Sequence, residues 1–236
     1  MRRLLTPTLL AALLLTSAAA PRAQNIPAPG TPKPYGLADP QTPAGQPAVN
    51  RGRLEGSTYS SDYFGVSFSV PQGWVVQDAD TLKAMKDTGE KIVMEGATAA
   101  KKAKIDAALA RSTILLSATK YPPGAPESGF QAQLMCIAER VPTALVKTGD
   151  DYIRLMQLSY KDTAAKMELM GPVRAAKVGG IAFTAADFKL AAGSVVLVQK
   201  YYVRLTKDYA LVLIYSYVDE ADLKTFDTFL GTVKFK

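Results

Sequence analysis

Three short motifs in the sequence together match the pattern of penicillin-interacting serine enzymes. Ser117-Ala118-Thr119-Lys120 fits SxxK, Lys147-Thr148-Gly149 fits KTG, and Ser61-Asp62-Tyr63 approaches SDN. In those enzymes the serine begins a helix, so that the lysine one turn later reaches its hydroxyl. Here the surrounding residues predict a strand, in which Ser117 and Lys120 project to opposite faces. KTG also falls at a predicted helix start, and the SDN-like element precedes the serine. A serine hydrolase acting through Ser117 is therefore the last of three functional hypotheses.

The residue types for other common catalytic chemistries are scarce. The chain of 236 residues contains no histidine, which removes the commonest general base, the Ser-His and Cys-His nucleophile pairs and the usual zinc sites. Its single cysteine, Cys136, excludes an intramolecular disulfide and alternates with Leu134 and Ala138, which indicates a small buried hydrophobic side chain. We predict no catalytic residue, no cofactor-binding residue and no metal ligand.

Carboxylates cluster at two predicted helix starts, Asp150 with Asp151 and Asp219 with Glu220 and Asp222. Negative side chains favour the positive end of a helix, so this placement explains the clusters without a site. A metal-binding or acid-base role remains the alternative, although adjacency in sequence does not show the geometry that such a role needs.

Aromatic side chains supply the candidates for ligand or partner contact. Tyr201, Tyr202 and Tyr217 belong to a tyrosine-rich hairpin, and Trp74 ends the stretch YFGVSFSVPQGW. Packing in the core or at its rim is the default interpretation for such residues, with a contact surface as the alternative. In that stretch we expect Pro71 to end a strand, Gly73 to permit a turn, and Trp74 to cover the end of the sheet.

The hydrophobic periodicity predicts an α+β fold. Alternation with a period of two predicts strands at 66–70, 113–120 and 131–141, then an antiparallel meander through 173–178, 181–190, 195–205 and 209–218. Helical spacing predicts helices at 81–87 and 99–111, one opening at Thr148, and one after Asp219 with the apolar stripe Leu223, Phe226, Phe229 and Leu230. We therefore expect a central antiparallel sheet with helices on both faces, an α/β/α sandwich.

Before this domain, two segments have different compositions. Residues 1–20 combine a basic start, a short apolar run and small residues, which predicts a secretory signal. Residues 21–52 are rich in proline and poor in large apolar side chains, which predicts a disordered linker that acts as a spacer or as a partner-binding arm. Residues 53–236 are expected to form a single globular domain. The formal charge of +7 is mildly basic, and the cluster Lys101, Lys102 and Lys104 is interpreted as a solvated face.

The two ends of the domain resemble the PsbP-like superfamily. The resemblance rests on YSSDYFGVSFSVPQGW near the start and YYVRLTKDYALVLIYSYVDEADLKTFDTFLGTVKF at the end, and it covers most of 59–236. It implies an α/β/α sandwich that usually works as a non-enzymatic binding or assembly module, often in exported bacterial proteins. Site-specific residues of the photosynthetic member have no recognisable counterpart here, so its role is not carried over.

Our leading hypothesis is a monomeric, non-enzymatic binding or accessory module, exported to the periplasm or outside the cell, that recognises a protein or cell-envelope component. We expect no nucleic-acid partner, no cofactor and no transmembrane segment after removal of the signal. The alternative is a periplasmic small-molecule carrier that holds its ligand between the sheet and a helix, with tyrosines such as Tyr201 in the wall.

Overall fold

A computed structural model describes residues 52–94, 110–122, 130–160, 166–192 and 195–236, together with Val49, Thr98, Lys102 and Asp106. The predicted signal, nearly all of the Pro-rich segment, and most of the predicted helix at 99–111 lie outside the described residues. No helix in the described part of the chain combines the length and the hydropathy that crossing a membrane requires.

Within the described residues, the larger of two sheets has eight strands, and each pair of neighbours is antiparallel. Its order is β4 (Val75–Val76), β5 (Ser112–Thr119), β6 (Gln133–Arg140), β11 (Tyr209–Tyr217), β10 (Val195–Thr206), β9 (Ile181–Ala192) and β7 (Lys166–Leu169), with β8 (Arg174–Val178) also paired to β9. Tight turns at Gly179-Gly180 and Lys207-Asp208, where the first three residues have positive φ, join consecutive strands as predicted. The expected antiparallel meander is confirmed.

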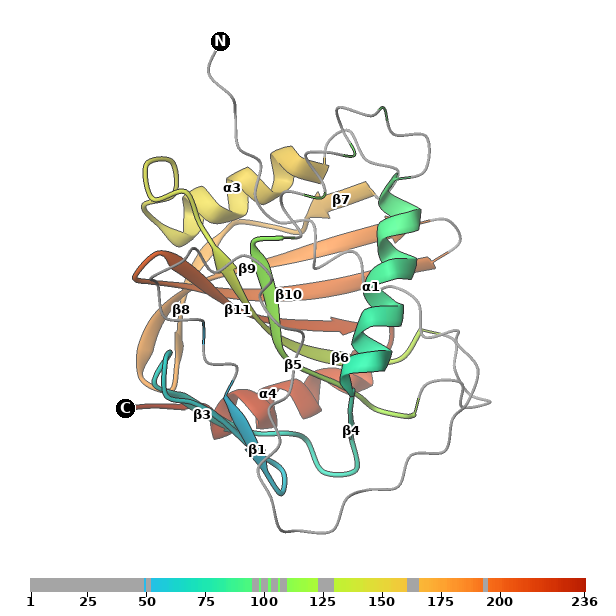
Figure 1. Cartoon of the computed structure of the whole chain (residues 1–236), viewed down its shortest axis with the longest axis vertical. Helices are drawn as coiled ribbons and strands as arrows, with labels where there is room; N and C mark the ends of the chain where they lie inside the picture. The colour runs from blue at the N-terminus through green and yellow to red at the C-terminus, as the bar shows by residue number, and fades with distance from the viewer. Residues whose placement is uncertain are drawn as a thin grey trace.

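A smaller antiparallel sheet of four described strands lies beside the larger one (Figure 1). Its order is β1 (Arg53–Glu55), β2 (Thr58–Ser61), β3 (Val66–Ser69) and β12 (Lys234–Phe235). Val66 and Phe68 of β3 are buried, while Ser67 and Ser69 between them are partly exposed, which confirms the predicted alternation. Strands from both ends of the domain thus meet in one sheet.

The two faces of the larger sheet bury separate hydrophobic clusters. The first-face cluster contains Ile153 and Met156 of α3 (Gly149–Tyr160) and Leu82 of α1 (Ala79–Met94). The second-face cluster contains Phe68 of the small sheet and Phe226 of α4 (Leu223–Thr232). Figure 1 shows α3 on one side of the larger sheet, and α4 with the small sheet on the other.

This arrangement confirms the α+β class and the central antiparallel sheet, and it corrects the layers. Helices as outer layers on both faces are not confirmed, because a four-stranded sheet forms much of the layer over the second face. β11 supplies side chains to both clusters, and all nine of its residues are buried, as expected for a strand that is covered on both faces.

The helix starts follow the predicted capping chemistry. The Thr148 hydroxyl accepts a hydrogen bond from the Asp151 N–H at 3.1 Å, and the Asp151 carboxylate accepts one from the Thr148 N–H at 3.1 Å. Asp219 accepts from the Ala221 N–H at 2.9 Å, but it caps the short 3-10 helix η1 (Glu220–Asp222), after which α4 begins. Capping therefore accounts for one member of each acidic cluster, Asp151 and Asp219, whereas the Asp222 carboxylate pairs with Lys120.

Candidate functional site

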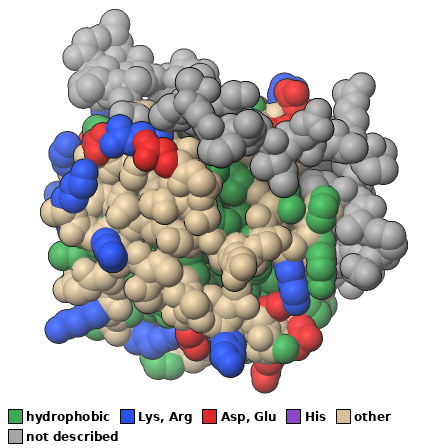
Figure 2. Space-filling model, turned by 90° about the horizontal axis from the view of Figure 1, so that it is seen from below, with side chains coloured by type: hydrophobic (Ala, Val, Ile, Leu, Met, Phe, Trp, Pro, Cys, Tyr) green, Lys and Arg blue, Asp and Glu red, His purple; other side chains and the backbone are tan. Residues whose placement is uncertain are grey.

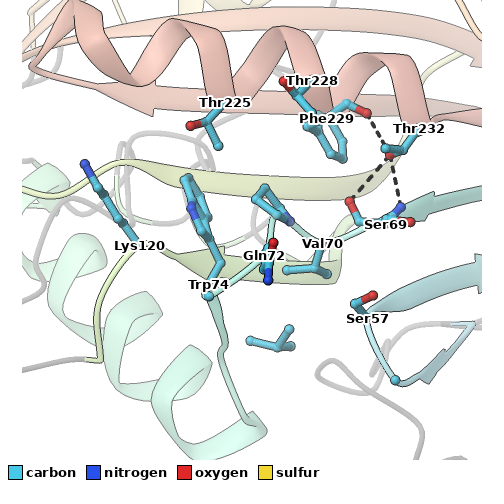
Figure 3. A pocket seen from close by; sticks show the side chains of 14 residues that line it. Ser57, Ser69, Val70, Gln72, Trp74, Lys120, Thr225, Thr228, Phe229 and Thr232 are labelled. Carbon is cyan, nitrogen blue, oxygen red and sulfur yellow. Dashed lines mark hydrogen bonds between the residues drawn. The ribbon is translucent and has the colours of Figure 1, made fainter.

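A groove with a volume of about 900 Å³ opens between the turn at 71–74 and α4. Its walls come from the β1–β2 turn, the end of β3, the segment from Pro71 to Trp74, the end of β5 and one side of α4. We call it the Trp74 groove, and Figure 3 shows the side chains that line it. Segments far apart in sequence thus meet at one surface site.

Local backbone geometry places Trp74 in this wall. Pro71 follows β3 and has no N–H to pair, Gly73 adopts a φ of 79°, and the Trp74 N–H donates to the Pro71 carbonyl at 3.1 Å, which closes the turn. The indole stacks on Tyr215 of β11, with ring centroids 5.9 Å apart and an interplanar angle of 24°. Trp74 is half-buried, so it both covers the sheet, as expected, and presents an edge to the groove.

One side of α4 forms the opposite wall. Thr225, Thr228, Phe229 and Thr232 follow the spacing i, i+3, i+4 and i+7, which places them on one helix face. The Thr232 hydroxyl accepts a hydrogen bond from the Ser69 N–H at 3.1 Å and donates one to the Phe229 carbonyl at 2.7 Å. These hydrogen bonds connect the end of α4 to β3. The Thr225 side chain has no hydrogen-bond partner among the described residues and faces the groove (Figure 3).

Lys120 is the charged residue among the described residues that line the groove. Its Nζ donates to Asp222 Oδ1 at 2.8 Å, and this hydrogen bond raises the pKa of Lys120. The paired carboxylate offsets the lysine charge, so the groove is close to neutral. Seen from the side of α4 and the small sheet, the charged side chains lie mostly near the edge of the face, around uncharged surface with hydrophobic side chains in its hollows (Figure 2).

The four aromatic candidates from the sequence do not converge on one site. Trp74 lines the groove, while Tyr202 and Tyr217 lie on the same face of the sheet but are not among its lining residues. Tyr202 packs edge-on against Phe226 at 5.6 Å between centroids, and Tyr217 is buried beside Tyr215 at 6.0 Å. Burial raises the pKa of both tyrosines.

Tyr201 lies on the opposite face of the sheet and has no exposed surface. Its hydroxyl donates to Gln199 Oε1 at 2.9 Å, and its ring packs edge-on against Phe188 at 5.3 Å. Burial, with smaller contributions from Tyr160 and Glu139, raises the pKa of Tyr201 well above its ordinary value. In this structure its surroundings are protein side chains, with no surface that a ligand between sheet and helix could contact.

The motifs of the hydrolase hypothesis occupy separate structural roles. Ser117 is fully buried, accepts a hydrogen bond from Gln133 Nε2 at 3.1 Å, and pairs across the sheet with Met135 of the first-face cluster. Lys120 projects to the groove on the other face, where it pairs with Asp222. Thr148 of the KTG match caps α3. The opposite projection expected for Ser117 and Lys120 is therefore observed.

The remaining titratable groups that the structure describes were candidates for a metal site or a reactive thiol. Among the described residues, no three His, Cys, Asp or Glu side chains lie together as metal ligands would. Cys136 is buried in the second-face cluster with Leu134 and Ala138, as predicted, and burial raises the pKa of its thiol far above the range in which a thiolate forms.

Sequence reasoning missed Lys120 and the threonines of α4 as groove residues. The repeat Thr225, Thr228 and Thr232 beside the apolar stripe of α4 was the available signal, since hydroxyls on a partly buried helix face indicate a polar surface beside the core. Lys120 gave no such signal, because its position depends on the packing of η1 against the end of β5.

No known protein family and no curated protein matches the sequence. Among solved structures, the fold is similar to the solution structure of cyanobacterial PsbP (CyanoP) from Synechocystis sp. PCC 6803. The TM-score is 0.45, the sequence identity is 15%, and the match covers 76% of this chain and 91% of that chain. The fold is also similar to LpqN, a protein involved in cell envelope biogenesis of Mycobacterium tuberculosis, with a TM-score of 0.39 and 11% identity over 72% of this chain and 83% of that chain. At these TM-scores and identities, the two likenesses assign neither a family nor an activity to this chain.

Proposed function

We propose that the protein is an exported, non-enzymatic binding module that recognises a protein or cell-envelope component through the Trp74 groove. The observation that carries the proposal is the groove itself: a neutral, open site whose walls combine one indole with several hydroxyl groups and an amide. Binding sites of comparable volume pair an apolar floor with a few polar groups that fix the orientation of the ligand.

The groove has both an apolar floor and polar groups at its rim. Val70, Pro71 and Phe229 supply apolar surface, while Gln72 and Thr225 supply donors and acceptors that have no partner in the described part of the chain. Because Lys120 is already paired with Asp222, the groove favours an uncharged ligand over an anion. An open groove also fits an extended segment of a larger molecule better than a small molecule, which would leave much of its surface in water.

The remaining features of the proposal follow the sequence. Residues 1–20 would direct export, and residues 21–52 would be the linker between this signal and the domain. Residues 53–236 would act as one monomeric unit in the periplasm or outside the cell. The absence of histidine from the chain and the full burial of Ser117 and Cys136 argue against turnover by a side-chain nucleophile.

Site-specific photo-crosslinking in the native cell tests this proposal. A photoreactive amino acid at Gln72, which is exposed in the groove, should give a discrete crosslinked product. The same amino acid at Glu168, which is exposed on β7 away from the groove, is the matched control and should give none. Equal crosslinking at both positions, or none at Gln72, would contradict the groove as the recognition site.

A further inference from the structure

We propose that the Trp74 groove binds an uncharged polysaccharide built from β-1,4-linked glucose or N-acetylglucosamine units. This inference rests on the proposed function, because it takes the groove to be the recognition site, and it adds the chemical class of the ligand. Recognition of a sugar chain needs a fixed aromatic surface, neutral groups that both donate and accept hydrogen bonds, and room for an extended chain. The described residues of the groove supply all three features.

The Trp74 indole ends a fixed stack of rings. It stacks on Tyr215 with 24° between the ring planes, and Tyr215 stacks on Phe226 with 18° between them. The Tyr215 hydroxyl donates a hydrogen bond to the Asp222 carbonyl at 2.8 Å, which fixes the middle of the stack. Tyr215 covers one face of the indole, and within the part of the chain that the structure describes Trp74 makes no other ring contact. Because the indole is held before a ligand arrives, stacking on its second face costs little ordering.

A sugar ring in the glucose configuration suits this surface. Its hydroxyl groups lie at the edge of the ring, so both ring faces present C–H groups with a partial positive charge. The face of an indole carries the negative part of the aromatic quadrupole, so it attracts these C–H groups while apolar area leaves the water. A ring with an axial hydroxyl would present an oxygen to the indole instead. Trp74 therefore favours rings in the glucose configuration.

The groove wall also has neutral side chains that can both donate and accept hydrogen bonds. Ser57, Gln72 and Thr225 line the groove, and their side chains have no hydrogen-bond partner among the described residues. A sugar hydroxyl is itself a donor and an acceptor, so hydroxyl and amide groups can pair with it in either direction. Lys120 is paired with Asp222 at 2.8 Å, so it adds N–H donors with little net charge. The groove therefore favours an uncharged sugar over an anionic one.

The shape of the groove fits a chain of sugars better than an extended peptide. Its volume of about 900 Å³ exceeds that of one sugar ring, and Figure 3 shows Trp74 and Gln72 between Lys120 and Ser57. An extended peptide binds along an open strand edge, where its main-chain groups can pair. β3, whose end forms part of the wall, is already paired with β2 on one edge and β12 on the other, and the opposite wall is a helix. The groove therefore offers side-chain hydroxyl and amide groups where a peptide would need a strand edge.

Isothermal titration calorimetry with three sugar hexamers tests the inference on the chain without residues 1–20, the predicted signal. Cellohexaose and chitohexaose are uncharged and distinguish glucose from N-acetylglucosamine units, whereas the hexamer of β-1,4-linked glucuronate keeps the ring configuration and adds negative charge. We expect at least one uncharged hexamer to bind and the glucuronate hexamer to bind most weakly of the three. Binding should also move the emission of Trp74, the single tryptophan of the chain, to shorter wavelength.

Variants of the groove locate the binding. Trp74→Leu removes the aromatic face but keeps apolar cover for the sheet, and it should lower the affinity about tenfold. Gln72→Ala removes an exposed amide and should lower the affinity about fivefold. The matched control Glu168→Ala changes an exposed residue of β7, away from the groove, and should bind as the unmodified chain does. Circular dichroism checks the fold of each variant, and Gln72→Ala keeps the test decisive if Trp74→Leu does not fold.

Three results of the titrations would overturn the inference: binding of neither uncharged hexamer, binding that Gln72→Ala leaves unchanged, or equal binding of the glucuronate hexamer. In cells, the product crosslinked at Gln72 should become smaller after treatment with a β-1,4-glycanase. A product that the glycanase leaves unchanged would overturn the sugar as ligand and leave the proposed function standing. Loss of the crosslink with retained hexamer binding would contradict recognition in the cell and support sugar binding alone.

Discussion

The two faces of the large sheet are packed with different kinds of side chain. Under α3, the first face buries mostly aliphatic residues together with the fully buried Glu139, whose carboxylate accepts from the Tyr152 hydroxyl at 2.8 Å. On the second face, ring contacts run from Phe68 through Phe229, Phe226 and Tyr215 to Trp74 at the groove. The ring contacts of the second face therefore lead to a surface site, whereas the described ring contact of the first face, Phe188 with Tyr201, lies in the core.

This difference separates stability from recognition within one sheet. Adjacent residues of β10 show it most directly: Tyr201 is fully buried on the first face, and Tyr202 is half-buried on the second. Aromatic rings have large apolar surfaces and tolerate a wet edge, so an aromatic cluster can extend from the core to a binding surface without exposing backbone. We therefore expect substitutions on the first face to change stability alone, and substitutions on the second face to change both stability and binding.

The largest expected effect comes from opening a cavity on the first face. Phe188→Ala removes a fully buried ring that packs against Tyr201, and it should lower the free energy of unfolding by about 3–5 kcal/mol. Urea denaturation followed by far-ultraviolet circular dichroism measures the loss. The native-state emission of Trp74, on the other face, should stay unchanged, and a shift in that emission would show that the two faces are coupled.

A smaller effect should distinguish the neighbouring tyrosines. Tyr201→Phe removes the hydroxyl that donates to the buried Gln199 Oε1, which should cost about 1–2 kcal/mol of unfolding free energy. Tyr202→Phe changes a half-buried residue and should cost less than about 0.5 kcal/mol. Denaturant titration of both variants under identical conditions tests this. Equal losses would remove the distinction between the two faces.

The burial of Tyr201 should also make the free energy of unfolding depend on pH in the alkaline range. Burial raises the pKa of Tyr201 in the folded state, whereas a tyrosine in the unfolded chain titrates near about pH 10. Above that pH the unfolded state holds fewer protons than the folded state, so stability is complete below it and falls as the pH rises, by about 1.4 kcal/mol per pH unit for this residue. Denaturant titrations between about pH 9 and about pH 11 should give a shallower decline for Tyr201→Phe than for the unmodified chain. Identical slopes would show that Tyr201 ionises as easily folded as unfolded.

Much of the large sheet could be predicted from the sequence because its strands alternate or are apolar on both faces. β11 is the clearest case: Leu211 and Leu213 fall on one face and Val212 and Ile214 on the other. β1, β2, β4 and β7 escaped prediction, because strands this short carry only a weak alternation. The small sheet was missed as a layer, since the pairing of β12 with β3 joins residues from opposite ends of the domain.

The candidate site could be predicted only in part, for a related reason. Trp74 stood out by residue type, and the turn chemistry of Pro71 and Gly73 explained its position. The position of α4 decides whether the Trp74 side chain lines a groove or is covered by the helix. That position depends on the hydrogen bond from the Ser69 N–H to the Thr232 hydroxyl, which joins residues far apart in the chain. Tyr201 and Tyr202 looked equivalent as a pair, but neighbours in a strand point to opposite faces.

The position of β11 in the sheet sets the order in which the protein can be completed during synthesis. This strand fills the gap between β6 and β10, and its residues, Tyr209–Tyr217, leave the ribosome after nearly all the others described. A nascent chain that has not reached them carries β6 with one edge of hydrogen-bonding groups unsatisfied and both clusters unfinished. We therefore expect the domain to commit to the folded state only after β11 has been made, and chains that stop before β11 to be substrates for proteases.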